Sequence, residues 1–190
     1  MFAVNTSVVH FQSIMGIIEI LNHGSTESGF DFLIIGGYAV NAHGYARLTV
    51  DLDILINKAH RDFWKELMLK NGYTVYNEHE NFSQFTPVAR DQLPVDFMFV
   101  NEQTFQKMRA EAVAGVMGGI KVKHPSLMHL IALKLHVIKQ ALPHRASKDL
   151  YDVIQLVQIN HVDVKSGDFK QLCEKFGDKK TYEAIVRATR

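Results

Sequence analysis

The spacing of apolar residues changes near residue 124, and this change limits the folds open to the chain. Before it, short apolar or alternating segments predict β-strands at residues 30–35, 49–56, 73–76, 82–88 and 95–100. After it, helical spacing predicts helices at residues 125–141, 148–159 and 168–188. We therefore expect an α/β (α+β) protein with a core at residues 1–123 and a C-terminal helical bundle at 124–190 that packs on it.

Helices are also expected inside the core. Apolar positions at helical spacing predict helices at residues 7–22 and 58–70. A shorter helix is expected at residues 38–43, where Gly44 ends it. The composition of residues 24–29 predicts a loop. The core is thus expected to be a mixed sheet flanked by helices.

Composition excludes several classes of protein. Apolar residues make up 47% of the 190 residues and charged residues 22%, which is typical of a folded domain. With 21 Lys and Arg against 20 Asp and Glu, the net charge of +1 excludes a uniformly basic nucleic-acid binder but leaves room for a local basic patch. The single cysteine, Cys173, cannot form an internal disulfide.

The sequence carries no sign of membrane insertion or secretion. The first residues lack the basic segment of a secretory signal. The longest charge-free apolar stretch, residues 32–46, is short and interrupted by glycines. We therefore expect a cytoplasmic protein with no membrane partner.

Acidic residues in two predicted strands are the main candidates for chemistry. Asp51 and Asp53 are two residues apart, so in a strand both side chains point to the same face. Asp96 lies between apolar neighbours in another predicted strand. If the two strands are adjacent, the three carboxylates converge at one edge of the sheet.

Such a cluster favours a bound divalent cation. Clustered carboxylates repel one another, and hard oxygen ligands suit Mg²⁺ together with substrate phosphates. Two such ions can hold the attacking and leaving oxygens of a phosphoryl transfer. The alternative is that Asp51 and Asp53 are simply the solvent-facing residues of an amphipathic strand, which is common for so short a motif.

Gly36 and Gly37 follow a predicted strand and precede a short helix. Glycine lets backbone amides approach a phosphate closely, and a helix N-terminus favours negative charge. Since the pair lies shortly before Asp51 in sequence, a phosphate site beside the carboxylates is expected. A Gly-Gly pair alone is more often only a turn.

Taken together, Gly36-Gly37, Asp51-Leu52-Asp53 and Val95-Asp96-Phe97 resemble the signature of the polymerase-β-type nucleotidyltransferase superfamily. The resemblance implies transfer of a nucleoside monophosphate from a nucleoside triphosphate to a hydroxyl, with two Mg²⁺ ions. It implies that Asp51, Asp53 and Asp96 are catalytic metal ligands and that Gly36, Gly37 and Tyr38 bind phosphates. Many members have Ser where this chain has Tyr38, whose hydroxyl has a different reach.

The helical part is similar to the C-terminal helices of the AbiEii-type toxin family, the nucleotidyltransferase half of a toxin–antitoxin system. The similar segments are residues 130–135 and 145–153. This resemblance implies an RNA acceptor, an antitoxin partner and nucleotide-binding roles for Arg47, Thr49, Lys134 and Asp149. Lincosamide and aminoglycoside nucleotidyltransferases resemble the same core and imply a small-molecule acceptor. A non-catalytic binding or antitoxin-like module is the third alternative.

Lys134 has two interpretations from its position alone. It falls on the apolar stripe of its predicted helix, where an ammonium group needs a specific partner. That partner is either an acid of the next helix, Asp149 or Asp152, or the anion of a bound triphosphate.

Overall fold

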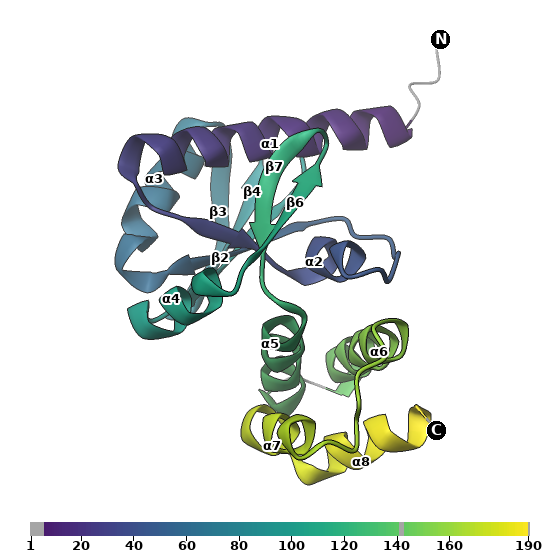
Figure 1. Cartoon of the computed structure of the whole chain (residues 1–190). Coiled ribbons are helices and arrows are strands. Elements are labelled where there is room, and N and C mark those ends of the chain that lie inside the picture. The colour runs from purple at the N-terminus through teal and green to yellow at the C-terminus, as the bar shows by residue number, and fades with distance from the viewer. Residues whose placement is uncertain (1–5, 141–142, 190) are drawn as a thin grey trace. The chain divides into compact units, whose positions relative to one another are not determined.

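A computed structural model describes residues 6–140 and 143–189, which form two compact units (Figure 1). The first unit comprises the residues up to Tyr38 together with Leu48–Pro125. The second comprises Ala39–Arg47 and the residues from Ser126 on. The chain therefore passes between the units at residues 38, 47 and 125. The division into domains at residues 1–123 and 124–190 stays a prediction.

A five-stranded mixed sheet forms the centre of the first unit, which confirms the predicted fold class. Its strand order is β1-β2-β5-β4-β3. β2 and β5 pair in parallel, and the other neighbours pair antiparallel. The strands are β1 (Phe32–Ile34), β2 (Leu52–Asn57), β3 (Tyr73–His79), β4 (Phe82–Pro87) and β5 (Val95–Val100).

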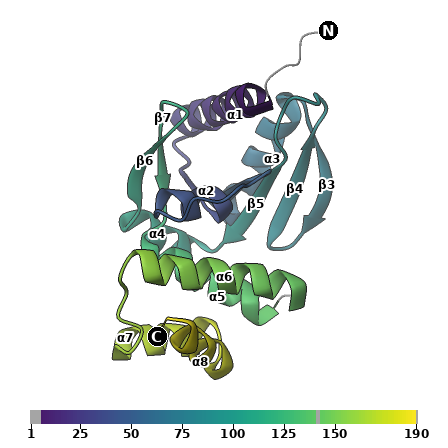
Figure 2. The ribbon, with the colours of Figure 1, turned by 90° about the vertical axis from the view of Figure 1, so that its right-hand side faces the viewer.

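Two helices cover one face of this sheet (Figure 2). They are α1 (Thr6–Ser28) and α3 (Arg61–Lys70), the latter preceded by the short helix η1 (Lys58–His60). Leu52, Ile54 and Ile56 of β2 are fully buried in the same core as Trp64 of α3. Since alternate residues of a strand point to opposite faces, Asp53 lies on the face away from α1 and α3.

Helix α4 and a second sheet complete the first unit, and neither was predicted. Helix α4 (Glu102–Ala110) contacts β2 and buries Phe105 and Met108. The second sheet is a hairpin of β6 (Val113–Met117) and β7 (Ile120–His124), turned by two glycines with positive φ. Its second strand alternates apolar and basic residues directly after the Gly118-Gly119 turn, a hairpin pattern that the sequence interpretation missed.

The predicted strand at residues 49–56 was wrong at its start, because β2 begins at Leu52. The Leu52 N–H donates to the carbonyl of Pro94 at 3.0 Å, where the pairing with β5 begins. Proline has no N–H with which to continue the ladder backwards. Asp51 therefore lies in a bend just before the strand.

The predicted loop at residues 24–29 was also wrong, because α1 continues to Ser28. Gly24 lets the helix pack closely, since a Cβ there would lie 2.5 Å from a Leu67 methyl group. Gly29 then ends the helix with φ +72° and donates its N–H to the carbonyl of Ser25 at 2.9 Å.

The second unit is helical, as expected. It contains α5 (Leu127–Gln140), α6 (Pro143–Ile159), α7 (Gly167–Phe176) and α8 (Lys179–Ala188). These helices share a core with Ala39 and Val40 of α2 (Gly36–Ala42), the helix in which the chain leaves the first unit. Helix α2 begins at Gly36 rather than at residue 38, so the glycine pair forms its first turn.

The single helix predicted at residues 168–188 is two helices. Gly177 follows the end of α7, and Asp178 begins α8 by accepting a hydrogen bond from the Thr181 N–H at 2.7 Å. The apolar spacing continues through this break, so periodicity alone did not reveal it. Among the described residues, no helix combines the length and hydropathy needed to cross a bilayer.

Candidate active site

Three carboxylates converge in the first unit. Asp51, Asp53 and Asp96, hereafter the acidic cluster, each offer an oxygen that lies within 4.8 Å of the others, and all three are half-buried. The predicted convergence is therefore confirmed. It does not occur on an edge strand, however, because β2 and β5 are interior strands of the sheet.

The parallel pairing of β2 and β5 explains how Asp53 and Asp96 meet. Each is the second residue of its strand, and they are directly paired in the register. Parallel strands begin at the same end of a sheet, so both carboxylates lie at that end and on the same face. Asp51 joins them from the bend that precedes β2.

Gly36 lies against the Asp53 carboxylate. The Ile35 N–H donates to the Asp53 carbonyl at 2.9 Å, which brings the first turn of α2 to this point. A Cβ on Gly36 would overlap the Asp53 side chain, and the φ of Gly36 is +60°. Only glycine satisfies both the close approach and the left-handed backbone.

Tyr38 lies near the acidic cluster and stays protonated. Burial, with a smaller contribution from the nearby charge of Asp51, raises the pKa of the Tyr38 hydroxyl to about 12. The phenol is therefore neutral near pH 7 and keeps its proton to donate. A hydroxyl that can donate a hydrogen bond is therefore present at the position where many members of the polymerase-β-type superfamily have serine.

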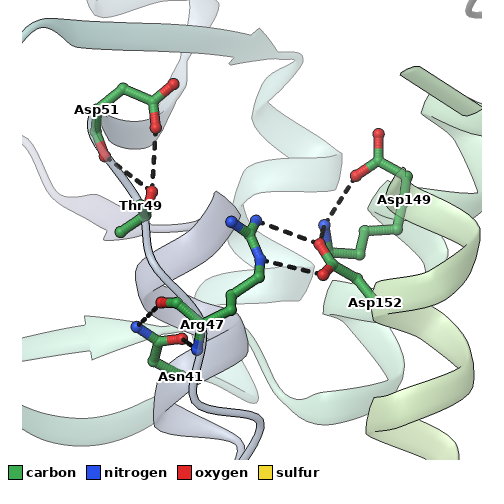
Figure 3. Close-up of polar contacts among 7 residues, drawn as sticks. Asn41, Arg47, Thr49, Asp51, Asp149 and Asp152 are labelled. Carbon is green, nitrogen blue, oxygen red and sulfur yellow. Dashed lines mark hydrogen bonds and ion pairs between the residues drawn. The ribbon is translucent and has the colours of Figure 1, made fainter. Parts of the chain in front are cut away.

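Thr49 holds Asp51 in place (Figure 3). Its buried hydroxyl donates to Asp51 Oδ1 at 3.0 Å and lies 3.4 Å from the Asp51 carbonyl. Thr49 was predicted to bind nucleotide, and what the structure shows is a bond to a member of the acidic cluster.

The sequence interpretation missed Gln84. Its amide donates from Nε2 to Asp96 Oδ2 at 2.7 Å, and its Oε1 accepts a hydrogen bond from Asn77 Nδ2 at 3.0 Å. Gln84 was visible only as a polar residue in a predicted strand. Its place opposite Asp96 depends on the register between β4 and β5, which no local pattern reveals.

The other predicted site residues form an ion-pair network inside the second unit (Figure 3). Lys134 Nζ lies 2.8 Å from Asp149 Oδ1 and 2.6 Å from Asp152 Oδ2. Arg47 approaches Asp152 with two nitrogens, Nε at 3.0 Å from Oδ1 and Nη2 at 3.2 Å from Oδ2. The network of Arg47, Lys134, Asp149 and Asp152 therefore balances two cations with two anions.

Asp152 is the centre of this network. Its side chain is 1% exposed and that of Lys134 is 7% exposed, so each needs the other as a counter-charge. The structure thus shows Lys134 in ion pairs with acids of the next helix, Asp149 and Asp152. Asn41 adds support by bonding both backbone groups of Arg47, at 3.0 and 2.9 Å.

The acidic cluster has the chemistry of a divalent-cation site. It supplies hard carboxylate oxygens close enough together to share one ion, and they are accessible rather than sealed in the core. Because Gly36 has no side chain, its backbone lies directly against the Asp53 carboxylate. The three carboxylates therefore fit Mg²⁺, and the cluster contains no cysteine or histidine ligand of the kind that softer metals prefer.

Several solved structures share this fold. The solution structure of the antibiotic-resistance factor ANT(2'')-Ia is similar over 97% of each chain, with a TM-score of 0.63 and 15% identity. An antigenic nucleotidyltransferase-like protein from Paracoccidioides brasiliensis is similar over 93% of each chain, with a TM-score of 0.55 and 15% identity. The lincomycin-bound lincosamide adenylyltransferase LnuA covers 78% of this chain and 96% of its own, with a TM-score of 0.56 and 15% identity. At these identities the likeness establishes the fold alone.

At the level of sequence, residues 14–188 match the family described as nucleotidyl transferase of unknown function, DUF2204. No curated protein matches the chain. The family match agrees with the nucleotidyltransferase resemblance of the sequence motifs. The finer AbiEii-type resemblance stays a prediction.

Proposed function

Because this chain belongs to the nucleotidyl transferase family DUF2204, we propose that it is a metal-dependent enzyme that transfers a nucleoside monophosphate from a nucleoside triphosphate to a hydroxyl. The observation that carries the proposal is the acidic cluster, three carboxylates within 4.8 Å of one another beside a backbone position that only glycine can occupy.

In this proposal Asp51, Asp53 and Asp96 hold Mg²⁺, with two ions in the complete site. The bound ions would neutralise the carboxylates and the charge that develops on the triphosphate during transfer. Asp96 accepts the proton of the acceptor hydroxyl. Thr49 and Gln84 support Asp51 and Asp96 through the hydrogen bonds described above.

The phosphates are proposed to bind beside the cluster. The backbone N–H groups of Gly36 and Gly37 contact the β and γ phosphates, because no side chain keeps them at a distance. The Tyr38 hydroxyl donates to the same phosphates, since a phenol is protonated near pH 7 even at its ordinary pKa and burial raises this pKa further.

Nucleotide contacts of Arg47, Lys134 and Asp149 are also proposed. They rest on the sequence resemblance alone, since in the second unit these side chains are engaged in ion pairs. The network still has a clear function for stability, which is to satisfy the buried charge of Asp152.

The acceptor is either RNA or a small molecule. An RNA acceptor, such as the 3′ end of transfer RNA, would also support a toxin role with an antitoxin partner. An antibiotic acceptor would follow the activities for which ANT(2'')-Ia and LnuA are described. Both acceptors offer a hydroxyl, so the proposed chemistry of the acidic cluster is the same for either.

The experiment incubates the protein with each nucleoside triphosphate labelled at the α-phosphate, with Mg²⁺. Separate reactions contain total RNA, a lincosamide or an aminoglycoside. We expect label to appear in one acceptor class, with release of pyrophosphate and complete loss of transfer in EDTA. Absence of transfer to all of these acceptors would favour the non-catalytic binding module instead.

A further inference from the structure

We propose that Gln84 and Asn77 are positioning residues that orient the Asp96 carboxylate for cation binding. The inference rests on the proposed function, because it concerns the same acidic cluster. It adds two residues that neither the motifs nor the family description assigns. It also identifies the irregularity in β3 as part of the site.

A polar row crosses four strands of the sheet. Asp53 of β2 is paired with Asp96 of β5, Asp96 with Gln84 of β4, and Gln84 with Asn77 of β3. Directly opposed side chains of neighbouring strands lie on the same face and within contact distance. The row therefore links the acidic cluster to the edge strand of the sheet.

The hydrogen bonds in this row have a fixed direction. An ionised carboxylate can only accept, so Gln84 must turn its NH₂ group towards Asp96. Its Oε1 then faces Asn77, whose NH₂ group donates to it at 3.0 Å. If the Gln84 amide turned over, both bonds would be replaced by contacts between two acceptors and between two donors. Asn77 thus fixes Gln84, and Gln84 fixes one oxygen of Asp96.

A bulge in β3 makes the contact between Asn77 and Gln84 possible. Val75 pairs with Phe85, so regular pairing would set Tyr76 opposite Gln84. The register shift instead sets Asn77 there and leaves Tyr76 77% exposed. Bulges commonly redirect a side chain beside an active site, and this one replaces a phenol with an amide.

Hydrogen bonds of this kind orient metal ligands in many proteins. Their loss typically weakens metal affinity by roughly 10- to 100-fold, because the ligand must be ordered again on binding. The Gln84 donor also offsets part of the repulsion among the three carboxylates. Both effects should be measurable without nucleotide and without turnover.

The test is a titration of the nucleotide-free protein with Mn²⁺, with free ion measured by electron paramagnetic resonance. We expect Gln84→Leu to weaken Mn²⁺ binding roughly 10- to 100-fold. Asn77→Ala should weaken it less, since Gln84 remains. The double variant should bind no worse than Gln84→Leu, because Asn77 acts only through Gln84.

Gln106→Leu is the matched control. Its amide also donates to a carboxylate, Glu102, at 2.8 Å, but from an exposed position of helix α4. It should bind Mn²⁺ like the wild type, and melting curves without metal should show every variant folded. Asn77 is exposed, so its variant tests the relay even if Gln84→Leu does not fold.

Two results would overturn the inference in distinguishable ways. Wild-type affinity in a folded Gln84→Leu variant, or in Asn77→Ala if that protein alone is folded, contradicts the positioning role only. A wild-type protein that binds no Mn²⁺ contradicts the proposed function, and the positioning role with it.

Discussion

Gly36 and Asp53 constrain each other through a direct contact of backbone and side chain. The glycine has a left-handed backbone, and the carboxylate occupies the space where a side chain would begin. A substitution at residue 36 must therefore disturb both the backbone and the acidic cluster.

We expect Gly36→Ala to lower the free energy of unfolding and to abolish Mn²⁺ binding. The left-handed backbone alone costs roughly 1–2 kcal/mol for alanine, and the overlap with Asp53 adds to that cost. Gly29→Ala is the matched control, because Gly29 has φ +72° but no atom within 4 Å of its missing Cβ. It should lose stability to a similar backbone cost and bind Mn²⁺ normally. Equal effects of the two substitutions on Mn²⁺ binding would refute the close contact.

The sequence predicted several residues of the acidic cluster, but it did not predict the contacts that hold their side chains in place. Asp51, Asp53 and Gly36 could be identified from local patterns, and Asp96 from the resemblance of the combined motifs to the superfamily signature. Gln84 and the centrality of Asp152 could not, because both depend on pairing between elements distant in sequence. Thr49 was identified, but its contact with Asp51 followed from a bend that the expected strand did not contain.

The contact between α5 and α6 contains the buried ion pairs of Lys134. The Lys134 ammonium of α5 and the Asp149 and Asp152 carboxylates of α6 are largely removed from water. Arg47 completes the charge balance. Breaking a buried pair leaves an uncompensated charge, which is far more costly than removing an exposed pair.

Lys134→Met is expected to lower the free energy of unfolding by about 3–5 kcal/mol, since methionine preserves the length of the side chain but not its charge. Combining it with Asp149→Asn should recover part of this loss, because Arg47 and Asp152 then remain as a balanced pair. The exposed Lys139→Met in the same helix serves as control and should change little. Denaturant unfolding measures these effects. A parallel calorimetric titration with Mg²⁺-nucleotide would show weaker binding only if Lys134 also contacts the nucleotide.

Helix α8 depends on Asp178 at its N-terminus. Hydrogen bonds from Thr181 hold the pKa of the Asp178 carboxyl below its usual value. Its stabilising effect is therefore full above the unfolded pKa of about 3.9 and is lost as the pH falls through the lower folded pKa. Asp178→Ala should cost about 1 kcal/mol near neutral pH, and Asp178→Asn much less. If the cost of Asp178→Ala stayed constant down to strongly acidic pH, the carboxylate would not be the stabilising species.

Elements were predicted best where spacing and end signals agreed. β5 begins after Pro94 and was predicted with its observed bounds. α4 was missed because its segment is short and mainly polar. The β6–β7 hairpin was missed although the Gly118-Gly119 turn and the alternation of β7 are a hairpin pattern. The break between α7 and α8 was missed because Gly177 and Asp178 interrupt the backbone without interrupting the apolar spacing.

At the scale of the whole molecule, the chain contributes to its two units in alternation. Residues 39–47 belong with the later helices, although they lie between the glycine pair and Asp51 in sequence. A pattern read along the chain gives no sign of this, because the segment is short and supplies two buried residues, Ala39 and Val40, with Tyr45 packed against the same core. The mixed sheet and the helical C-terminal third were nevertheless predictable, since each has its own periodicity.

The acidic cluster is proposed to carry out nucleotidyl transfer, and Asp53→Asn removes one of its three carboxylates. The change is nearly isosteric and removes one of three like charges, so without metal the melting temperature should hold or rise slightly. Asp91→Asn, at an exposed turn of the same unit, is the control and should keep full turnover.

The deciding measurement is turnover with the labelled nucleoside triphosphate and the acceptor that the screen identifies. Our account predicts that Asp53→Asn lowers turnover by at least roughly 1,000-fold in a folded protein, because transition-state charge is no longer neutralised. A folded Asp53→Asn protein with wild-type turnover would show that the acidic cluster is not the catalytic site.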